Sequence, residues 1–150
     1  MLLSPHFSVA ELTHTDTGLP NDPTVVEGAN LVVLAEKLLE PIRELLAVLM
    51  LIHSGFRSLE VNRRVGGDPK SAHLEGRACD FHPGGDMTCR EAFDKIRNSS
   101  VPYDKVLLEE HGGRFWIHVQ IARAGAQPRG LAYIAQVTDS GTAYRLVPRG

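Results

Sequence analysis

The chain has 150 residues, of which 43% are hydrophobic, and its formal net charge at pH 7 is −2. This length suits a single domain over residues 1–150 with its own hydrophobic core. The nearly balanced charge, without a run of Lys and Arg, argues against a nucleic-acid partner, and two cysteines are too few for a disulfide framework. The N-terminus lacks the pattern of a signal peptide, and no apolar run is long enough to span a membrane. We therefore expect a monomer without membrane insertion that is cytoplasmic when made.

The N-terminal part of the chain predicts a loop-rich segment followed by a long helix. Residues 1–23 form the loop-rich segment, and the capping-box spacing of Ser8 and Glu11 predicts one short helical turn within it. From residue 24 to about residue 49, apolar side chains recur with a helical period. Pro41 should kink or restart this helix, because proline has no N–H to continue the hydrogen-bond pattern.

The remainder of the chain alternates strand patterns with short helices. Strands are predicted at residues 47–55, which should be short and buried, and at residues 76–83, 103–110 and 114–121. Helices are predicted at residues 58–64 and 88–99, the second capped by Thr88, and a final hairpin within residues 131–147. Hairpin links between strands predict an α+β fold, with an antiparallel sheet and flanking helices. The last residues, 144–150, end in LVPRG, which is either native or a protease-site remnant of an expression vector.

Three residues from separate parts of the chain could share one metal site. His73 precedes a predicted strand, Asp80 lies on that strand, and His118 lies on a later one. Two imidazoles and one carboxylate suit Zn²⁺, and three protein ligands leave a fourth position for water, as in catalytic zinc sites. The alternative is that these histidines are isolated surface or hydrogen-bonding residues.

Other residues near these positions have simpler interpretations. His53 and His82 have no partner at ligand spacing, although His82 could orient Asp80 as an outer contact. Cys79 should point away from Asp80 into the core. Gly76 is expected to be small for backbone packing.

Three stretches resemble the D-alanyl-D-alanine carboxypeptidase-type zinc peptidases: SGFRS, VNRRVGGDPKSAHLEGRACDF and FWIHV. This family includes bacterial cell-wall carboxypeptidases, D,D-dipeptidases and phage endolysins. Its pattern S-x-H-x-x-G-x-A-x-D is matched from Ser71 to Asp80, and its W-x-H element by Trp116 and His118. The stretches FSVAELTHTDTG and LEPIRELL also resemble the phage and prophage branch. The resemblance covers roughly residues 7–121 and implies the hedgehog/D,D-peptidase α+β fold.

The resemblance implies a role for each matching residue. His73, Asp80 and His118 would bind Zn²⁺. Arg57 would contact the substrate carbonyl or carboxylate and stabilise developing negative charge, which a fixed guanidinium does well in a water-poor cleft. Ser71 would hydrogen-bond the substrate backbone. Without the resemblance, Arg57 would be taken as a surface ion pair and Ser71 as a loop or cap residue.

The general base is not given by the resemblance. Several relatives carry it as Glu three residues before the last ligand, or as the first His of H-x-H, but Phe115 and Trp116 occupy those places here. Glu109, Glu110 and His111 are the nearby candidates. All three could instead be exposed polar loop residues.

Strand alternation favours Glu109 among these candidates. If Gly112-Gly113 forms a two-residue turn, Glu109 lies on the same sheet face as His118, whereas a three-residue loop would place Glu110 there. Gly-Gly is favoured in type I′ turns, which are two-residue loops. This loop length predicts Glu109 as the base. Its strand also resembles the FDQLILE strand of phage-type relatives.

We therefore expect a Zn²⁺-dependent peptidase that hydrolyses peptidoglycan stem or cross-link peptides, of the D-Ala-D-Ala carboxypeptidase or L-Ala-D-Glu endopeptidase type. A phage or prophage lysin that acts on the cell wall after release fits the absence of a signal peptide. One alternative is a non-catalytic, zinc-containing phage structural or cell-wall-binding module of the same fold. Another is a zinc-binding signalling domain similar to hedgehog.

Overall fold

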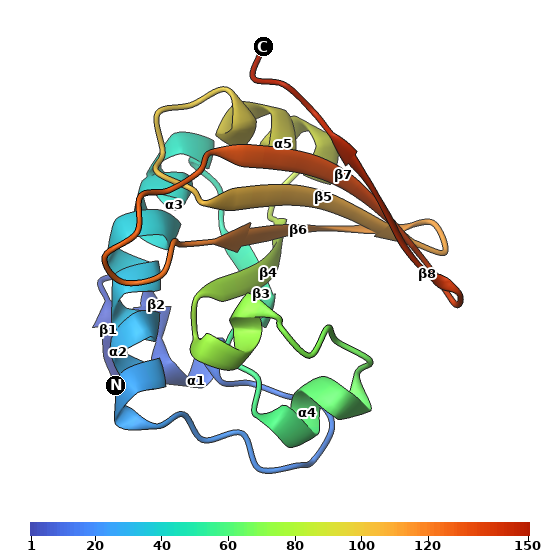
Figure 1. Cartoon of the computed structure of the whole chain (residues 1–150). Coiled ribbons are helices and arrows are strands. Elements are labelled where there is room, and N and C mark those ends of the chain that lie inside the picture. Colours follow the sequence, from blue (N-terminus) through green and yellow to red (C-terminus); the bar gives the residue numbers. More distant parts are fainter.

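The computed structural model describes residues 1–150, and its main feature is a six-stranded sheet with helices packed on one face (Figure 1). The α-helices are α1 (Val9–Leu12), α2 (Val25–Leu34), α3 (Glu40–Leu46), α4 (Leu59–Arg64) and α5 (Cys89–Arg97). A π-helical turn, η1 (Ala35–Leu39), joins α2 to α3, and a 3₁₀ turn, η2 (Ala72–Glu75), precedes β4. The strands are β1 (Leu2–Ser4), β2 (Phe7–Ser8), β3 (Met50–Ser54), β4 (Ala78–Pro83), β5 (Lys105–His111), β6 (Arg114–Gln120), β7 (Leu131–Thr138) and β8 (Gly141–Leu146). No helix has the length and apolar character needed to cross a membrane.

The large sheet has the strand order β3-β4-β6-β5-β7-β8. All neighbouring strands are antiparallel except β5 and β7, so the predicted α+β architecture with a mainly antiparallel sheet is confirmed. The parallel pair arises because residues 121–130 cross over the start of β5, where Lys105 pairs with Leu131. The sequence did not predict this crossover, nor the small β1-β2 sheet within the loop-rich N-terminal segment.

The predicted long helix restarts at Pro41, as expected. Thr24 caps α2 through a capping box with Glu27, and the helix widens into η1 immediately before α3 begins. Proline within the first turn of α3 cannot donate to the preceding turn, so the α-helical hydrogen-bond pattern is interrupted there. The caps predicted at Ser8 and Thr88 are also present.

The strand predicted at residues 47–55 is present as β3, but β3 is an edge strand and only partly buried, so the predicted burial is wrong. Met50 is buried, whereas Leu51 is 53% exposed. A short apolar run can form either an edge strand or a central strand. Its exposure depends on which strands pair with it, and its own composition does not reveal this. The register of β3 against β4 shifts between Ile52 and Ser54.

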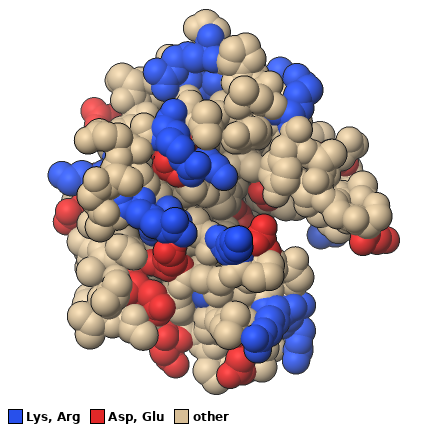
Figure 2. Space-filling model, viewed as in Figure 1, with Lys and Arg blue, Asp and Glu red and all other residues tan.

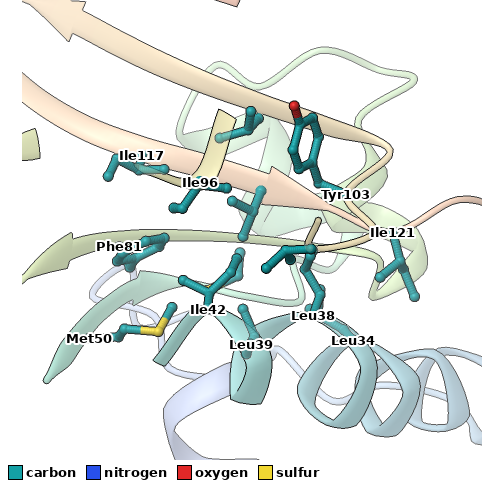
Figure 3. Close-up of a cluster of buried hydrophobic side chains, with 14 of the residues drawn as sticks. Leu34, Leu38, Leu39, Ile42, Met50, Phe81, Ile96, Tyr103, Ile117 and Ile121 are labelled. Carbon is teal, nitrogen blue, oxygen red and sulfur yellow. The ribbon is translucent and has the colours of Figure 1, made fainter. Parts of the chain in front are cut away.

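The core lies between the helices and one face of the large sheet (Figure 3). Leu34, Leu38 and Ile42 from the helical segment pack towards Phe81 and Ile117 from the strands. Each such buried side chain contributes about 1.5–3 kcal/mol through removal of apolar surface from water. Cys79 is fully buried here, as predicted. The opposite sheet face is therefore left for polar side chains.

The β5-β6 hairpin has the predicted two-residue turn. Gly112 and Gly113 have φ angles of 60° and 80°, as a type I′ turn requires. His111 pairs with Arg114, and Glu109 pairs with Trp116. This register fixes which side chains of β5 share a face with His118.

Candidate metal centre

Three buried side chains converge on the polar face of the sheet. Asp80 on β4 lies directly opposite His118 on β6, and η2 brings His73 against both. One ligand atom from each residue lies within 4.8 Å of the others. The Asp80 Oδ1 atom is 3.2 Å from His73 Nε2 and 3.0 Å from His118 Nδ1. The three residues are only 2–8% exposed, so water does not solvate this cluster freely.

Outer contacts fix which nitrogen of each imidazole faces the cluster. His73 Nδ1 lies 2.6 Å from the Gly55 carbonyl oxygen, which can only accept, so Nδ1 carries the proton. His118 Nε2 lies 2.9 Å from Gln120 Oε1. The Gln120 amide nitrogen donates to Asp104 Oδ2 over 3.0 Å, which makes Oε1 the acceptor for His118.

Neutral imidazoles in these tautomers direct two nitrogen lone pairs towards the same carboxylate oxygen. Such an arrangement repels unless a proton or a metal cation lies among the three atoms. A divalent metal ion supplies that charge, and two imidazoles with one carboxylate are a donor set that zinc accepts. In metal-binding histidines, the ring nitrogen that does not bind the metal usually donates to a carbonyl or carboxylate oxygen. His73 Nδ1 and His118 Nε2 make such contacts here. The side chains of His73, Asp80 and His118 therefore fit a zinc ion.

Burial and the close contacts among the three side chains shift the pKa of each of them. Burial raises the pKa of the Asp80 carboxyl, but the charges and hydrogen bonds of His73 and His118 outweigh this and hold the pKa well below its usual range. Burial lowers the pKa of His73. Burial also acts to lower the pKa of His118, but without a metal ion the protonated ring can donate to Asp80, and this hydrogen bond and the Asp80 charge raise the pKa above the ordinary value.

Arg57 contacts the second oxygen of Asp80. Its Nη2 atom donates to Asp80 Oδ2 over 3.1 Å, its Nε to Ser54 Oγ over 2.9 Å and its Nη1 to Asn62 Oδ1 over 3.2 Å. The side chain is 15% exposed, so it is not the ordinary surface ion pair considered from sequence. The guanidinium still has N–H groups free after these bonds.

Glu109 lies on the cleft side of the sheet, half-buried beside Trp116. Burial raises the pKa of its carboxyl, and the nearby Asp80 charge raises it further. Glu110 points to the other face, and its Oε1 atom accepts a hydrogen bond from the Gly113 N–H over 2.9 Å. His111 is exposed and does not line the cleft. Of the three candidate bases, only Glu109 shares the cleft with His118.

Ser71 and Gly76 bracket the turn that presents His73. Ser71 caps η2, and its hydroxyl oxygen accepts from the His73 N–H over 3.2 Å. Gly76 ends the turn with a φ angle of 73°, and a Cβ atom there would lie 2.6 Å from the Glu27 carbonyl oxygen. The sequence interpretation of Gly76 as a packing residue is therefore confirmed. Ser71 also lines the cleft, so a cap role and a substrate contact are compatible.

A cleft of about 880 Å³ opens over the cluster. Residues 65–68 line it on one side, and Val137, Thr142 and Tyr144 of the β7-β8 hairpin line it on the other. This volume is within the range of small-molecule and cofactor sites, roughly 300–1,000 Å³. Basic and acidic side chains both surround the hollow in the space-filling view (Figure 2).

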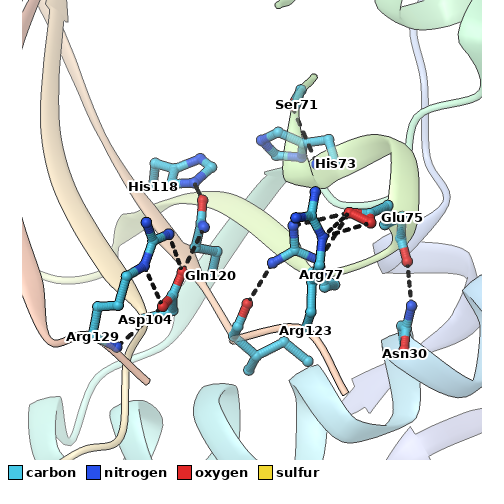
Figure 4. Close-up of polar contacts among 11 residues, drawn as sticks. Asn30, Ser71, His73, Glu75, Arg77, Asp104, His118, Gln120, Arg123 and Arg129 are labelled. Atoms are coloured by element: carbon cyan, nitrogen blue, oxygen red, sulfur yellow. Dashed lines mark hydrogen bonds and ion pairs between the residues drawn. The ribbon is translucent and has the colours of Figure 1, made fainter. Parts of the chain in front are cut away.

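Sequence reasoning did not find the side chains that support His118 from outside the cluster. Gln120 contacts His118, Asp104 holds Gln120, and Arg129 binds both oxygens of Asp104 (Figure 4). Gln120 could have been found, because residues two apart on a strand share a face. Asp104 and Arg129 lie on separate loop segments, and nothing in their spacing indicates this contact.

Comparison with known proteins places the chain in a family. A family model described as Peptidase M15 matches residues 5–120. No curated protein matches the chain significantly. The match covers most of the chain, including His73, Asp80 and His118. The chain belongs to the Peptidase M15 family and is a zinc metallopeptidase.

Proposed function

We propose that this peptidase hydrolyses the stem or cross-link peptides of peptidoglycan, beside D-Ala or between L-Ala and D-Glu. The observation that carries the proposal is the buried His73–Asp80–His118 cluster at the floor of a cleft in a Peptidase M15 chain. A phage or prophage lysin released to the cell wall is the biological setting that the resemblance of the N-terminal half favours.

His73, Asp80 and His118 are the proposed zinc ligands, through Nε2, a carboxylate oxygen and Nδ1 respectively. When bound, Zn²⁺ polarises a carbonyl and lowers the pKa of water towards neutral. The Gly55 carbonyl and the Gln120 amide oxygen hold the two imidazoles in the tautomers that metal binding needs. The ligands are thus oriented before any substrate binds.

Glu109 is the proposed general base. Its carboxylate lies on the cleft face, and partial burial with the Asp80 charge raises its pKa, which favours proton acceptance. In the reaction it takes a proton from the attacking water and passes it to the nitrogen of the leaving amine. The C–N bond of the peptide breaks as this proton arrives.

Arg57 has two proposed tasks. Its bond to Asp80 Oδ2 keeps Oδ1 directed at His73 and His118. Its free N–H groups can donate to the substrate carbonyl oxygen as negative charge develops, or to a substrate carboxylate. The bonds to Ser54 and Asn62 hold the guanidinium still, which is what electrostatic stabilisation of a transition state requires.

The charge of the cleft supports a substrate that carries carboxylates. Six Lys and Arg side chains line it, against four Asp and Glu. Arg57 and Arg129 are paired with Asp80 and Asp104, whereas Lys70 and Lys105 form no ion pair. Free cations attract anionic groups such as the carboxylates of peptidoglycan stems. Ser71 is proposed to hydrogen-bond the backbone of the bound peptide.

Mass spectrometry of purified murein after digestion by the zinc-loaded protein tests this function. New stem fragments ending at one defined bond are the expected result, and their masses identify the bond. Intact stems after prolonged digestion would instead support a non-catalytic wall-binding module. Glu109→Gln is the matched control, because it leaves the proposed zinc ligands unchanged.

A further inference from the structure

A second pair of histidines lies beside the cluster, on strands β3 and β4. Ser54 pairs with Asp80 and Ile52 with Phe81, so His53 is the extra residue of a bulge. His82 lies opposite Leu51 in the same pair of strands. Bulges re-aim side chains near functional sites, and this one turns the His53 ring onto His82.

The two imidazoles meet nitrogen to nitrogen. Their ring centroids are 4.1 Å apart with an interplanar angle of 80°, and His53 Nε2 contacts His82 Nδ1. Neither ring has a hydrogen bond or ion pair with any other group, in contrast to His6 and His14, which contact carboxylates. His53 is exposed and His82 half-buried, so solvent ions reach both nitrogens.

We propose that His53 and His82 form a second metal site, which binds Zn²⁺ and similar borderline cations such as Ni²⁺ and Cu²⁺. Imidazole nitrogen is a preferred ligand of these ions. A small rotation of the two rings opens the space between the facing nitrogens. Two protein ligands leave the remaining positions to water, so the metal is held more weakly than by three ligands and exchanges readily.

This site is separate from the His73–Asp80–His118 cluster. His82 follows Asp80 by two residues on the same strand face, so their Cα atoms are about 7 Å apart along β4. Metal ions that act together on one substrate are about 3.5–4 Å apart. Asp80 cannot bridge the sites, because Oδ1 faces His73 and His118 while Oδ2 binds Arg57. The inference therefore does not depend on the proposed function.

Zinc titration of the metal-free protein, followed by calorimetry, tests the second site. We expect two binding steps, a tight one and a weaker one, with about one zinc in each. His53→Gln and His82→Gln should each remove only the weak step, and His118→Ala should weaken only the tight one. His111→Gln, an exposed histidine on the β5-β6 turn, should keep both steps.

Cobalt substitution gives a second readout that does not depend on heat. The absorption of Co²⁺ in the wild type should grow in two stages, and His82→Gln should lack the second. A single step in the wild type would overturn the inference and leave the pair as an N–H···N hydrogen bond. A weak step that survives both His53→Gln and His82→Gln would also overturn it, because another surface histidine would then be the ligand.

Discussion

Replacement of Glu109 by glutamine removes the negative charge of the carboxylate but keeps the size and shape of the side chain. The amide is the same size and remains half-buried next to Trp116. The hydrogen bonds that hold the three proposed zinc ligands do not involve Glu109. Stability and zinc content should therefore stay close to those of the wild type. Glutamine cannot accept the proton of the attacking water, and loss of a general base costs about 10²–10⁴-fold in rate. We predict a fall of at least about 10²-fold in kcat on purified murein, the low end of that range.

Glu110→Gln is the matched control for this experiment. Glu110 lies on the opposite sheet face, and its Oε1 atom accepts from the Gly113 N–H. A glutamine oxygen can accept the same bond, so kcat should change little. Both variants are assayed side by side at equal zinc occupancy. An inactive Glu110→Gln variant with an active Glu109→Gln variant would refute the assignment drawn from the hairpin register, and two active variants would remove both residues from catalysis.

Three further substitutions probe the surroundings of the cluster. Arg57→Lys should retain zinc but lower kcat/KM by about 10²-fold, because an ammonium cannot reproduce the fixed fork of donors; unchanged kcat/KM would contradict this role. Gln120→Leu should weaken zinc binding about 10–100-fold in chelator competition, because His118 loses its outer acceptor, and unaltered affinity would argue against that support. Asp104→Asn should lower the free energy of unfolding by about 1–3 kcal/mol at neutral pH, because Arg129 loses its charged partner. Hydrogen bonds from Arg129 hold the pKa of Asp104 below its usual range, so this stability is fully present above the unfolded-state pKa and is lost as pH falls from there through the folded-state pKa. The difference between wild type and Asp104→Asn in urea unfolding should shrink in acid, and a difference that grows would show the wrong sign.

Local signals in the sequence predicted the features that depend on a few neighbouring residues. The caps at Ser8 and Thr88, the helix restart at Pro41 and the Gly112-Gly113 turn each follow from backbone chemistry within one or two turns. The turn then fixed the pairing of the whole β5-β6 hairpin. The motif around residues 71–80 likewise identified residues that the fold brings together.

Features that depend on chain-distant packing were not predictable in this way. Nothing in the composition of β3 distinguishes an edge strand from a central one, and the crossover of residues 121–130 has no local signature. The contact of Arg129 with Asp104 exists because that crossover brings Arg129 next to the start of β5. The pairing of His53 with His82 depends on a bulge, which a regular alternation pattern does not reveal.

The metal content of purified protein is the most direct test of the central claim that His73, Asp80 and His118 hold the zinc ion. After dialysis against metal-free buffer to remove weakly held ions, the wild type should contain about one zinc per chain, as expected for one three-ligand site. His118→Ala should lose most of this zinc, because only two ligands remain. Full zinc retention by His118→Ala would contradict the account and place the zinc elsewhere in the chain.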